Sequence, residues 1–117
     1  RVFKRYCVNF RAQMNMAGSK KAFKAIVRNI SIIGVGVIAR SMVHKDSIVL
    51  LKLSTFISRD ELLEFKAKVV RVGNKGDIYE YGLEIIEIDD KNKDMLDKLI
   101  FCLNTNENTF IEDLIKF

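Results

Sequence analysis

Length, composition and charge narrow the class of protein. A chain of 117 residues, 49% of them hydrophobic, can close one core and has no room for two full domains. The net charge of +5 favours partners that carry phosphate: nucleic acid, nucleotides or an anionic membrane surface. The longest uncharged apolar run, residues 30–39, is far shorter than the roughly 20 residues of a membrane-spanning helix, and no signal peptide is evident. We therefore expect one soluble, cytoplasmic domain.

The first residue is Arg1 rather than Met, so we expect a fragment of a longer chain that lacks its N-terminal residues. Cys7 and Cys102 do not have the CxxC spacing of zinc or redox sites, and both are expected to be packed free thiols. The lone His44 has no cluster of possible metal ligands beside it. We expect neither a metal site nor a bound cofactor.

The N-terminal part predicts a β-hairpin. Residues 6–14 alternate strictly between apolar and polar, which is the period of a half-buried strand. The stretch "NMAGSKK" then supplies a glycine and polar residues for a reversal of the chain. Residues 22–30 follow as the second strand, with Phe23, Ala25 and Val27 on one face.

Four more short runs predict strands, at residues 34–40, 47–53, 65–72 and 78–88. Six strands without long helices between them indicate an all-β-dominated, antiparallel barrel or sandwich. Between the fourth and fifth strands, Ser58 and Glu61 fit a capping box. That segment is expected to be either one helical turn or a loop.

The C-terminal part changes to helical periodicity. Residues 91–103 predict an amphipathic helix that lies on the barrel, with Asp89 and Asp90 at its start as caps. The stretch "NTNEN" is expected to end it, and Thr109 with Glu112 predicts a second, short terminal helix. We therefore divide the chain into a barrel domain at residues 1–103 and a helical extension at residues 104–117.

Two polar motifs flank this predicted hairpin. The arm "RVFKR" places Arg1 and Arg5 just before the first strand, and "NISIIG" places Asn29, Ser31 and Gly34 at the end of the second. Together they resemble the signature of the PilZ domain family, RxxxR followed by (D/N)xSxxG. The stretch "YEYGLEI", with Gly82, also looks like a strand of that family. The resemblance covers residues 1 to about 103 and implies a six-stranded barrel followed by a helix.

The resemblance implies a receptor for cyclic di-GMP, with Arg1, Arg5, Asn29, Ser31 and Gly34 as its ligand-binding residues. The sequence has no Ser/His/Asp set, no HExxH motif and no paired carboxylates in an apolar setting, so we expect that the chain is not an enzyme. The resemblance also implies an output in motility, exopolysaccharide production or another bacterial signalling response, through a partner protein or an upstream domain.

The chemistry of these residues agrees with cyclic di-GMP as the ligand. Arginine can pair with a guanine edge, clamp a phosphate and stack on a base. An asparagine oxygen can accept from the guanine donors N1–H and N2–H, with less charge assistance than aspartate gives. Serine can contact a base edge or a phosphate, and a glycine lets the backbone approach the ligand.

Alternatives remain at this point. The same fold could act without the ligand as a protein-interaction module, and the apolar face of the C-terminal helix could serve that role or form a homodimer. A basic barrel could instead bind single-stranded nucleic acid, with Phe10, Tyr79 and Tyr81 as stacking platforms, although these aromatic residues are more often core. The stretch "GVG" lacks the third glycine of a dinucleotide-binding loop, so we interpret Gly36 as a kink in a strand.

Overall fold

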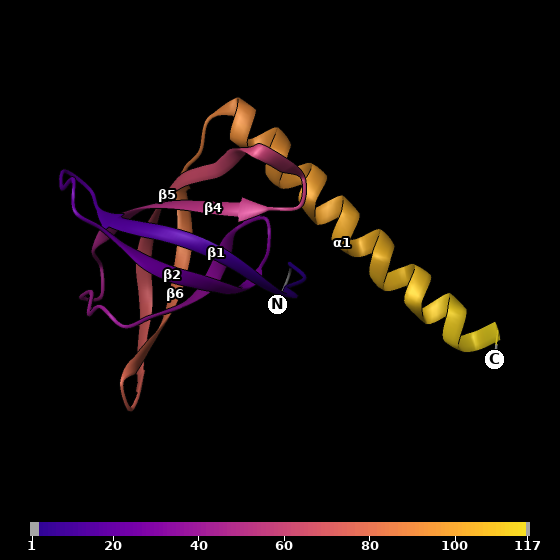
Figure 1. Cartoon of the computed structure of the whole chain (residues 1–117), viewed down its shortest axis with the longest axis horizontal. Helices are drawn as coiled ribbons and strands as arrows, with labels where there is room; N and C mark the ends of the chain where they lie inside the picture. Colours follow the sequence, from indigo (N-terminus) through magenta and orange to yellow (C-terminus); the bar gives the residue numbers. More distant parts are fainter. Residues whose placement is uncertain (1–2, 117) are drawn as a thin grey trace.

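Six antiparallel strands form a closed ring in a computed structural model of the chain, and one helix follows them (Figure 1). The structure describes the backbone of residues 3–116 and the side chains of residues 3–105. Around the ring the strands follow the order β1-β2-β3-β6-β5-β4. Their bounds are β1 Tyr6–Met16, β2 Ala22–Ile30, β3 Gly34–Ala39, β4 Ile48–Thr55, β5 Ser58–Lys75 and β6 Ile78–Glu87, and the helix α1 is Asp90–Lys116. The predicted set of six antiparallel strands followed by a helix is confirmed.

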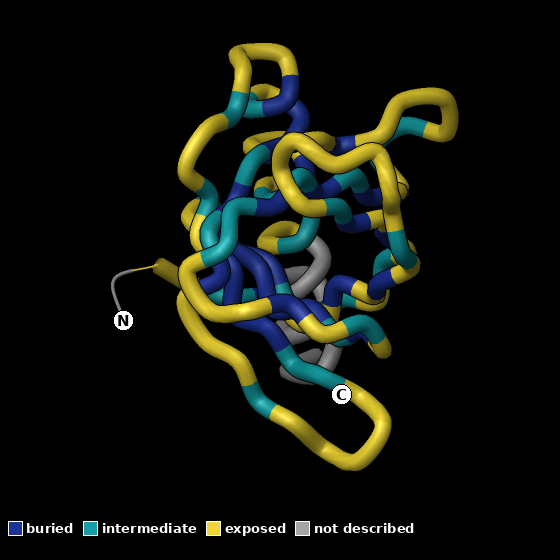
Figure 2. The backbone as a smooth tube through the Cα atoms, turned by 90° about the vertical axis from the view of Figure 1, so that its left-hand side faces the viewer, coloured by how far each residue is buried: buried dark blue, intermediate teal, exposed yellow. Residues whose placement is uncertain are grey.

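The interior of the ring is filled by the side chains that alternate inward along each strand. Figure 2 shows these buried positions alternating with exposed ones, while the hairpin ends are exposed. Apolar burial of this kind is the main favourable term in folding. The fully buried core includes Met14, Val27, Val35, Leu51, Leu63, Val69 and Leu83 from the strands, with Leu96 and Leu99 from α1.

Polar side chains fix the start of α1 against the ring. A carboxylate oxygen of Asp89 accepts hydrogen bonds from the backbone N–H and the side-chain amide of Asn92, at 2.8 and 2.9 Å. These bonds lower the pKa of the Asp89 carboxyl. The carboxamide oxygen of Asn92 accepts in turn from the backbone N–H of Glu64 in β5, at 2.9 Å. The predicted cap is therefore confirmed at Asp89, and it also holds the helix to a strand.

The predicted break in the C-terminal helix is wrong, and so is the separate short terminal helix. α1 continues from Asp90 to Lys116 through "NTNEN". Asparagine and threonine are only moderately unfavourable in a helix, whereas glycine or proline, which this stretch lacks, would end it more effectively. The Thr105 hydroxyl donates to the carbonyl of Phe101 one turn earlier, at 2.9 Å. The side chains of Thr109 and Glu112 lie outside the described residues.

Within the described part of the chain, no helix has the length and apolar character needed to span a membrane.

The fifth strand is longer than predicted. Neither a helical turn nor a loop forms at Ser58, because β5 begins there and Thr55 pairs with it across a tight hairpin. The Ser58 hydroxyl does accept from the N–H of Glu61 at 3.1 Å, which is the local bond that a capping box supplies. The same contact is compatible with a strand, so the motif misled the prediction.

Cys7 is exposed rather than packed, because it occupies an outward position of β1.

Candidate functional site

The two predicted motifs meet on the outer surface of the ring. The guanidinium Nη1 of Arg5 donates to the carboxamide oxygen of Asn29 at 2.7 Å, although the two residues are far apart in the sequence. Both side chains are half-buried. Arg1, the other predicted arginine, lies outside the described residues. The next residue after the arm, Tyr6, donates from its hydroxyl to the side-chain oxygen of Asn104 in α1 at 3.0 Å, so the base of the arm is tied to the helix.

Ser31 and Gly34 shape the turn that follows Asn29. The buried Ser31 hydroxyl accepts from the N–H groups of Ile33 and Gly34, at 3.3 and 3.2 Å, and donates to the Gly34 carbonyl at 3.3 Å. A Cβ on Gly34 would collide with the carbonyl of Leu83 in β6. Both motif residues therefore have a structural role here. Serine closes the turn between β2 and β3, and glycine allows β3 to approach β6.

Gly36 makes room for the Asn29 side chain. The two residues are partners across β2 and β3, and a Cβ on Gly36 would lie 2.8 Å from the Asn29 Cγ, which is too close for real atoms. The pairing shifts by one residue between Val27 and Asn29, so a β-bulge lies directly before the asparagine. Bulges are common beside functional sites because they redirect a side chain. Gly36 is more than a strand kink, because it is the position over which Asn29 lies.

A second glycine, Gly82 of β6, lies beside Gly36 and is covered in the same way. The two glycines are register partners, and Gly82 is in turn the partner of Arg71 in β5. The Arg71 side chain passes over Gly82, with Cβ, Nη2 and Cζ at 3.3, 3.4 and 3.5 Å from where a Cβ would be. We call the four residues Asn29, Gly36, Gly82 and Arg71 the glycine row. Two side chains thus lie over a short stretch of sheet that has none of its own.

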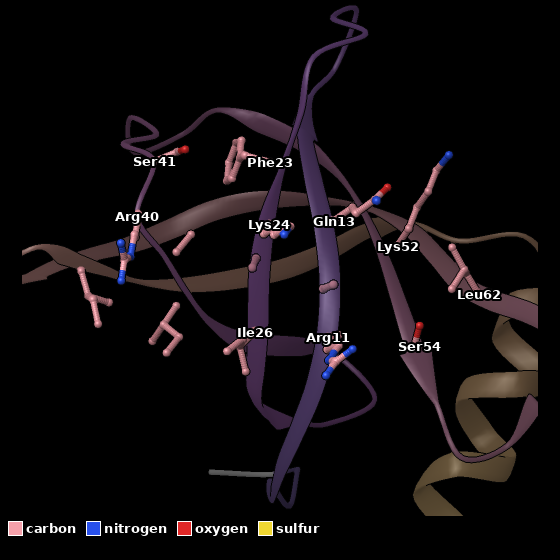
Figure 3. A pocket seen from close by; sticks show the side chains of 15 residues that line it. Arg11, Gln13, Phe23, Lys24, Ile26, Arg40, Ser41, Lys52, Ser54 and Leu62 are labelled. Atoms are coloured by element: carbon pink, nitrogen blue, oxygen red, sulfur yellow. The ribbon is translucent and has the colours of Figure 1, made fainter. Parts of the chain in front are cut away.

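A broad hollow lies elsewhere on the outer surface. A groove of about 1080 Å³ runs over β1 and β2 and their neighbours, and Figure 3 shows its side chains. Four of them, Arg11, Lys24, Arg40 and Lys52, are cations, and none of its lining residues is acidic. We call this region the basic groove. None of the predicted site residues that the structure describes lines it.

The aromatic residues considered as stacking platforms point inward. Tyr81 is 1% exposed, and its hydroxyl donates to the Ser41 carbonyl at 2.6 Å and accepts from the Val43 N–H at 2.8 Å. Burial raises the pKa of that hydroxyl. Tyr79 and Phe10 are partly buried and pack against the core. Tyr81 therefore has no face open to a base, and Tyr79 and Phe10 use part of their surface to pack against the core, so these rings do not form the open row of platforms that the nucleic-acid alternative requires.

The ring and the glycine row define a small β-domain whose polar site lies on the outside of the strands rather than inside them. The family profile of the PilZ domain matches residues 1–102, and the chain belongs to this family. The resemblance inferred from the motifs is therefore confirmed. No curated protein sequence matches the chain.

Solved structures share the fold at low sequence identity. The inhibitor of motility of Bacillus subtilis (MotI/DgrA) is 19% identical with a TM-score of 0.74, and the match covers 92% of this chain and 52% of that one. YcgR of Escherichia coli in complex with c-di-GMP is 11% identical with a TM-score of 0.77, covering 97% and 50%. The isolated PilZ domain of YcgR with c-di-GMP is 10% identical with a TM-score of 0.72, covering 96% and 97%. The chain thus spans about half the length of MotI and of the longer YcgR chain.

Sequence reasoning identified Arg5 and Asn29 but missed the role of Gly36 and the position of Arg71. The alternation of β3 places Val35 and Val37 inward and Gly36 outward, and the alternation of β6 does the same for Gly82. Outward glycines in two strands were the signal available in the sequence, since an outward strand position gains nothing from glycine unless something approaches closely. The pairing of β3 with β6 brings the two glycines together, and it cannot be predicted from the sequence of either strand alone.

Proposed function

We propose that this chain is a receptor domain for cyclic di-GMP that binds the nucleotide on the outer surface of the ring, between the arginine arm and the end of β2. The single observation that carries the proposal is the hydrogen bond between Arg5 and Asn29. It joins the two halves of the motif that led to the family. Membership of the PilZ family and the likeness to YcgR structures that contain c-di-GMP support the same ligand.

The contacts follow from the chemistry of the side chains. Asn29 presents its oxygen to the guanine N1–H or N2–H, while Arg5 and Arg1 take a phosphate or the O6 and N7 acceptors of guanine. Ser31 and Gly34 support binding indirectly, because their hydrogen bonds and close packing fix the turn that follows Asn29. The domain binds without transforming the ligand, so its output is a conformational change.

The arm is the moving part of this mechanism. Ordering a residue costs about 1–2 kcal/mol, so the arginine contacts to the ligand must exceed the cost for the whole arm. Arg5 already contacts Asn29, which reduces the ordering that the ligand has to impose. Closure of the arm reorients an upstream domain or a bound partner protein, with regulation of motility or exopolysaccharide production as the output.

Calorimetric titration with cyclic di-GMP tests the proposal. We expect the wild-type chain to bind, and the Arg5→Ala variant to show no measurable binding. Arg59→Ala is the matched control, because Arg59 is an exposed arginine of β5 outside the glycine row. Undiminished affinity in the Arg5 variant would overturn the site. Binding of oligonucleotides with a steep salt dependence and no response to cyclic di-GMP would overturn the function.

A further inference from the structure

We infer that Arg71 is a third arginine of the ligand site, and that a guanine base of the ligand stacks on its guanidinium while Asn29 reads the edge of that base. This inference rests on the proposed function and extends its site across the ring to β5. The register places the residues in one row: Asn29 opposite Gly36, Gly36 opposite Gly82, and Gly82 opposite Arg71. Directly opposed residues of antiparallel strands have Cα atoms about 4.5–5.5 Å apart, so the two glycines form one continuous floor.

The two ends of the glycine row are built in the same way. A shift of register lies between Val27 and Asn29 in β2, and another lies between Val69 and Arg71 in β5. In both strands the last residue before the shift is a fully buried valine, and the residue after it is a polar side chain that covers a glycine. A β-bulge costs regular pairing and serves to redirect side chains. The matched pair of bulges indicates that both side chains are aimed at one place.

The position of the Arg71 guanidinium suits a stacking surface. The atoms Cβ, Cζ and Nη2 all lie within 3.3 to 3.5 Å of the Cβ position of Gly82, so the side chain is folded down along the sheet. Arg71 is exposed, which leaves the outer side of the group accessible. A guanidinium is planar and weakly hydrated, and it stacks on aromatic faces, which an ammonium group does poorly.

The charge of Arg71 is not neutralised by a described side chain. No hydrogen bond or ion pair of Arg71 occurs among residues 3–105 under the usual distance limits. Two carboxylates share its face of β6. Glu80 is held by Lys75 at 3.0 Å, and Glu84 makes no ion pair with Arg71 within 4.0 Å. An exposed arginine beside a glycine floor and a carboxamide therefore keeps its full charge for a ligand that is anionic and aromatic.

The experiment compares four variants, Arg71→Ala, Arg71→Lys, Asn29→Ala and Arg40→Ala, by calorimetry with cyclic di-GMP and with cyclic di-AMP. We expect both Arg71 variants to bind cyclic di-GMP about tenfold more weakly, since lysine keeps the charge and loses the plane. Stacking does not distinguish the bases, so the ratio of the two affinities should stay constant in the Arg71 variants and fall in Asn29→Ala. Arg40→Ala removes the same charge from the basic groove and should bind like the wild type.

The outcomes separate this inference from the function on which it rests. If the wild type does not bind cyclic di-GMP, the proposed function fails. If the wild type binds and Arg71→Ala binds equally well, only the role of Arg71 fails. Wild-type affinity in Arg71→Lys would show a contact by charge alone and would overturn stacking. Arg71 is exposed and its removal leaves the core intact, so equal melting temperatures for the variants and the wild type are expected.

Discussion

The glycine row and the basic groove lie on the same outer surface of the ring, and they differ in how their polar groups are held. In the basic groove, cations such as Lys24 and Arg40 surround a large volume, and most of them make no specific contact with a described side chain. In the glycine row, Asn29 is fixed by Arg5, by a bulge and by the glycine beneath it. A groove of diffuse charge attracts anions, whereas fixed donors and acceptors can select one of them. The smaller region is therefore the better candidate for recognition of a nucleotide.

Among variants that leave the arginine arm unchanged, the largest effect is expected for Gly36→Ala. The new methyl group would occupy the space of the Asn29 carboxamide, so the residue that we propose to contact guanine moves away from its place. Loss of a well-aligned contact to a base edge corresponds to about tenfold to 100-fold weaker binding of cyclic di-GMP. Calorimetry measures this directly. A Gly73→Ala variant controls for the general effect of losing a strand glycine, because a Cβ there would meet only ordinary van der Waals contacts, at 3.8 and 4.0 Å from Glu80.

Tyr81→Phe should affect stability without affecting recognition. The change leaves the Val43 N–H and the Ser41 carbonyl without their buried partner at the edge of the basic groove, which costs about 2 kcal/mol of unfolding free energy. Denaturant unfolding measures the loss, and titration should find wild-type affinity. The wild-type stability should also fall as pH rises above about 10, the ordinary tyrosine pKa, because the unfolded state ionises first. That decline should be smaller in Tyr81→Phe.

Asn29→Asp should strengthen binding by less than about tenfold. A carboxylate accepts from the guanine donors with charge assistance, but it also forms an ion pair with Arg5, which stabilises the unliganded site. The gain is the difference between these two effects. Titrations at low and high salt separate them, because the ionic contribution is screened. Weaker binding in the aspartate variant would mean that the pair with Arg5 holds the site closed.

The smallest effect is expected in the basic groove. The double variant Lys24→Ala with Arg40→Ala removes two cations from its lining and should leave the affinity for cyclic di-GMP unchanged at physiological salt. A loss as large as that of Gly36→Ala would reverse the comparison and assign the nucleotide to the groove. The measurement is the same titration, with the melting temperature of each variant as the control for folding.

Local patterns predicted the strands well where alternation is strict. The bounds of β2 agree at both ends with the predicted residues 22–30, because buried and exposed positions alternate there up to the bulge. The start of β5 was missed because Ser58 and Glu61 make the same local hydrogen bond in a strand as in a helix cap. The helix end was missed because "NTNEN" weakens a helix without stopping it.

The candidate site divides along a similar line. Arg5 and Asn29 could be predicted because their motifs are contiguous in the sequence. The position of Arg71 beside Gly82 could not be predicted, since it depends on which strands become neighbours and on a bulge that shifts β5 by one residue. Strand order and bulges arise from the packing of the whole ring, which no single segment specifies.

The hydrogen bond between Tyr6 and Asn104 fixes α1 to the base of the arm, beside the proposed ligand site. Beyond Asn104 the helix continues to Lys116, and at about 1.5 Å per residue this adds about 18 Å of helix. Figure 1 shows this part extending away from the strands. A small tilt of the helix where it contacts Tyr6 displaces the C-terminal end of the helix by a larger distance. A shift of a few tenths of an ångström at the base of the arm can therefore become a displacement that a neighbouring molecule detects.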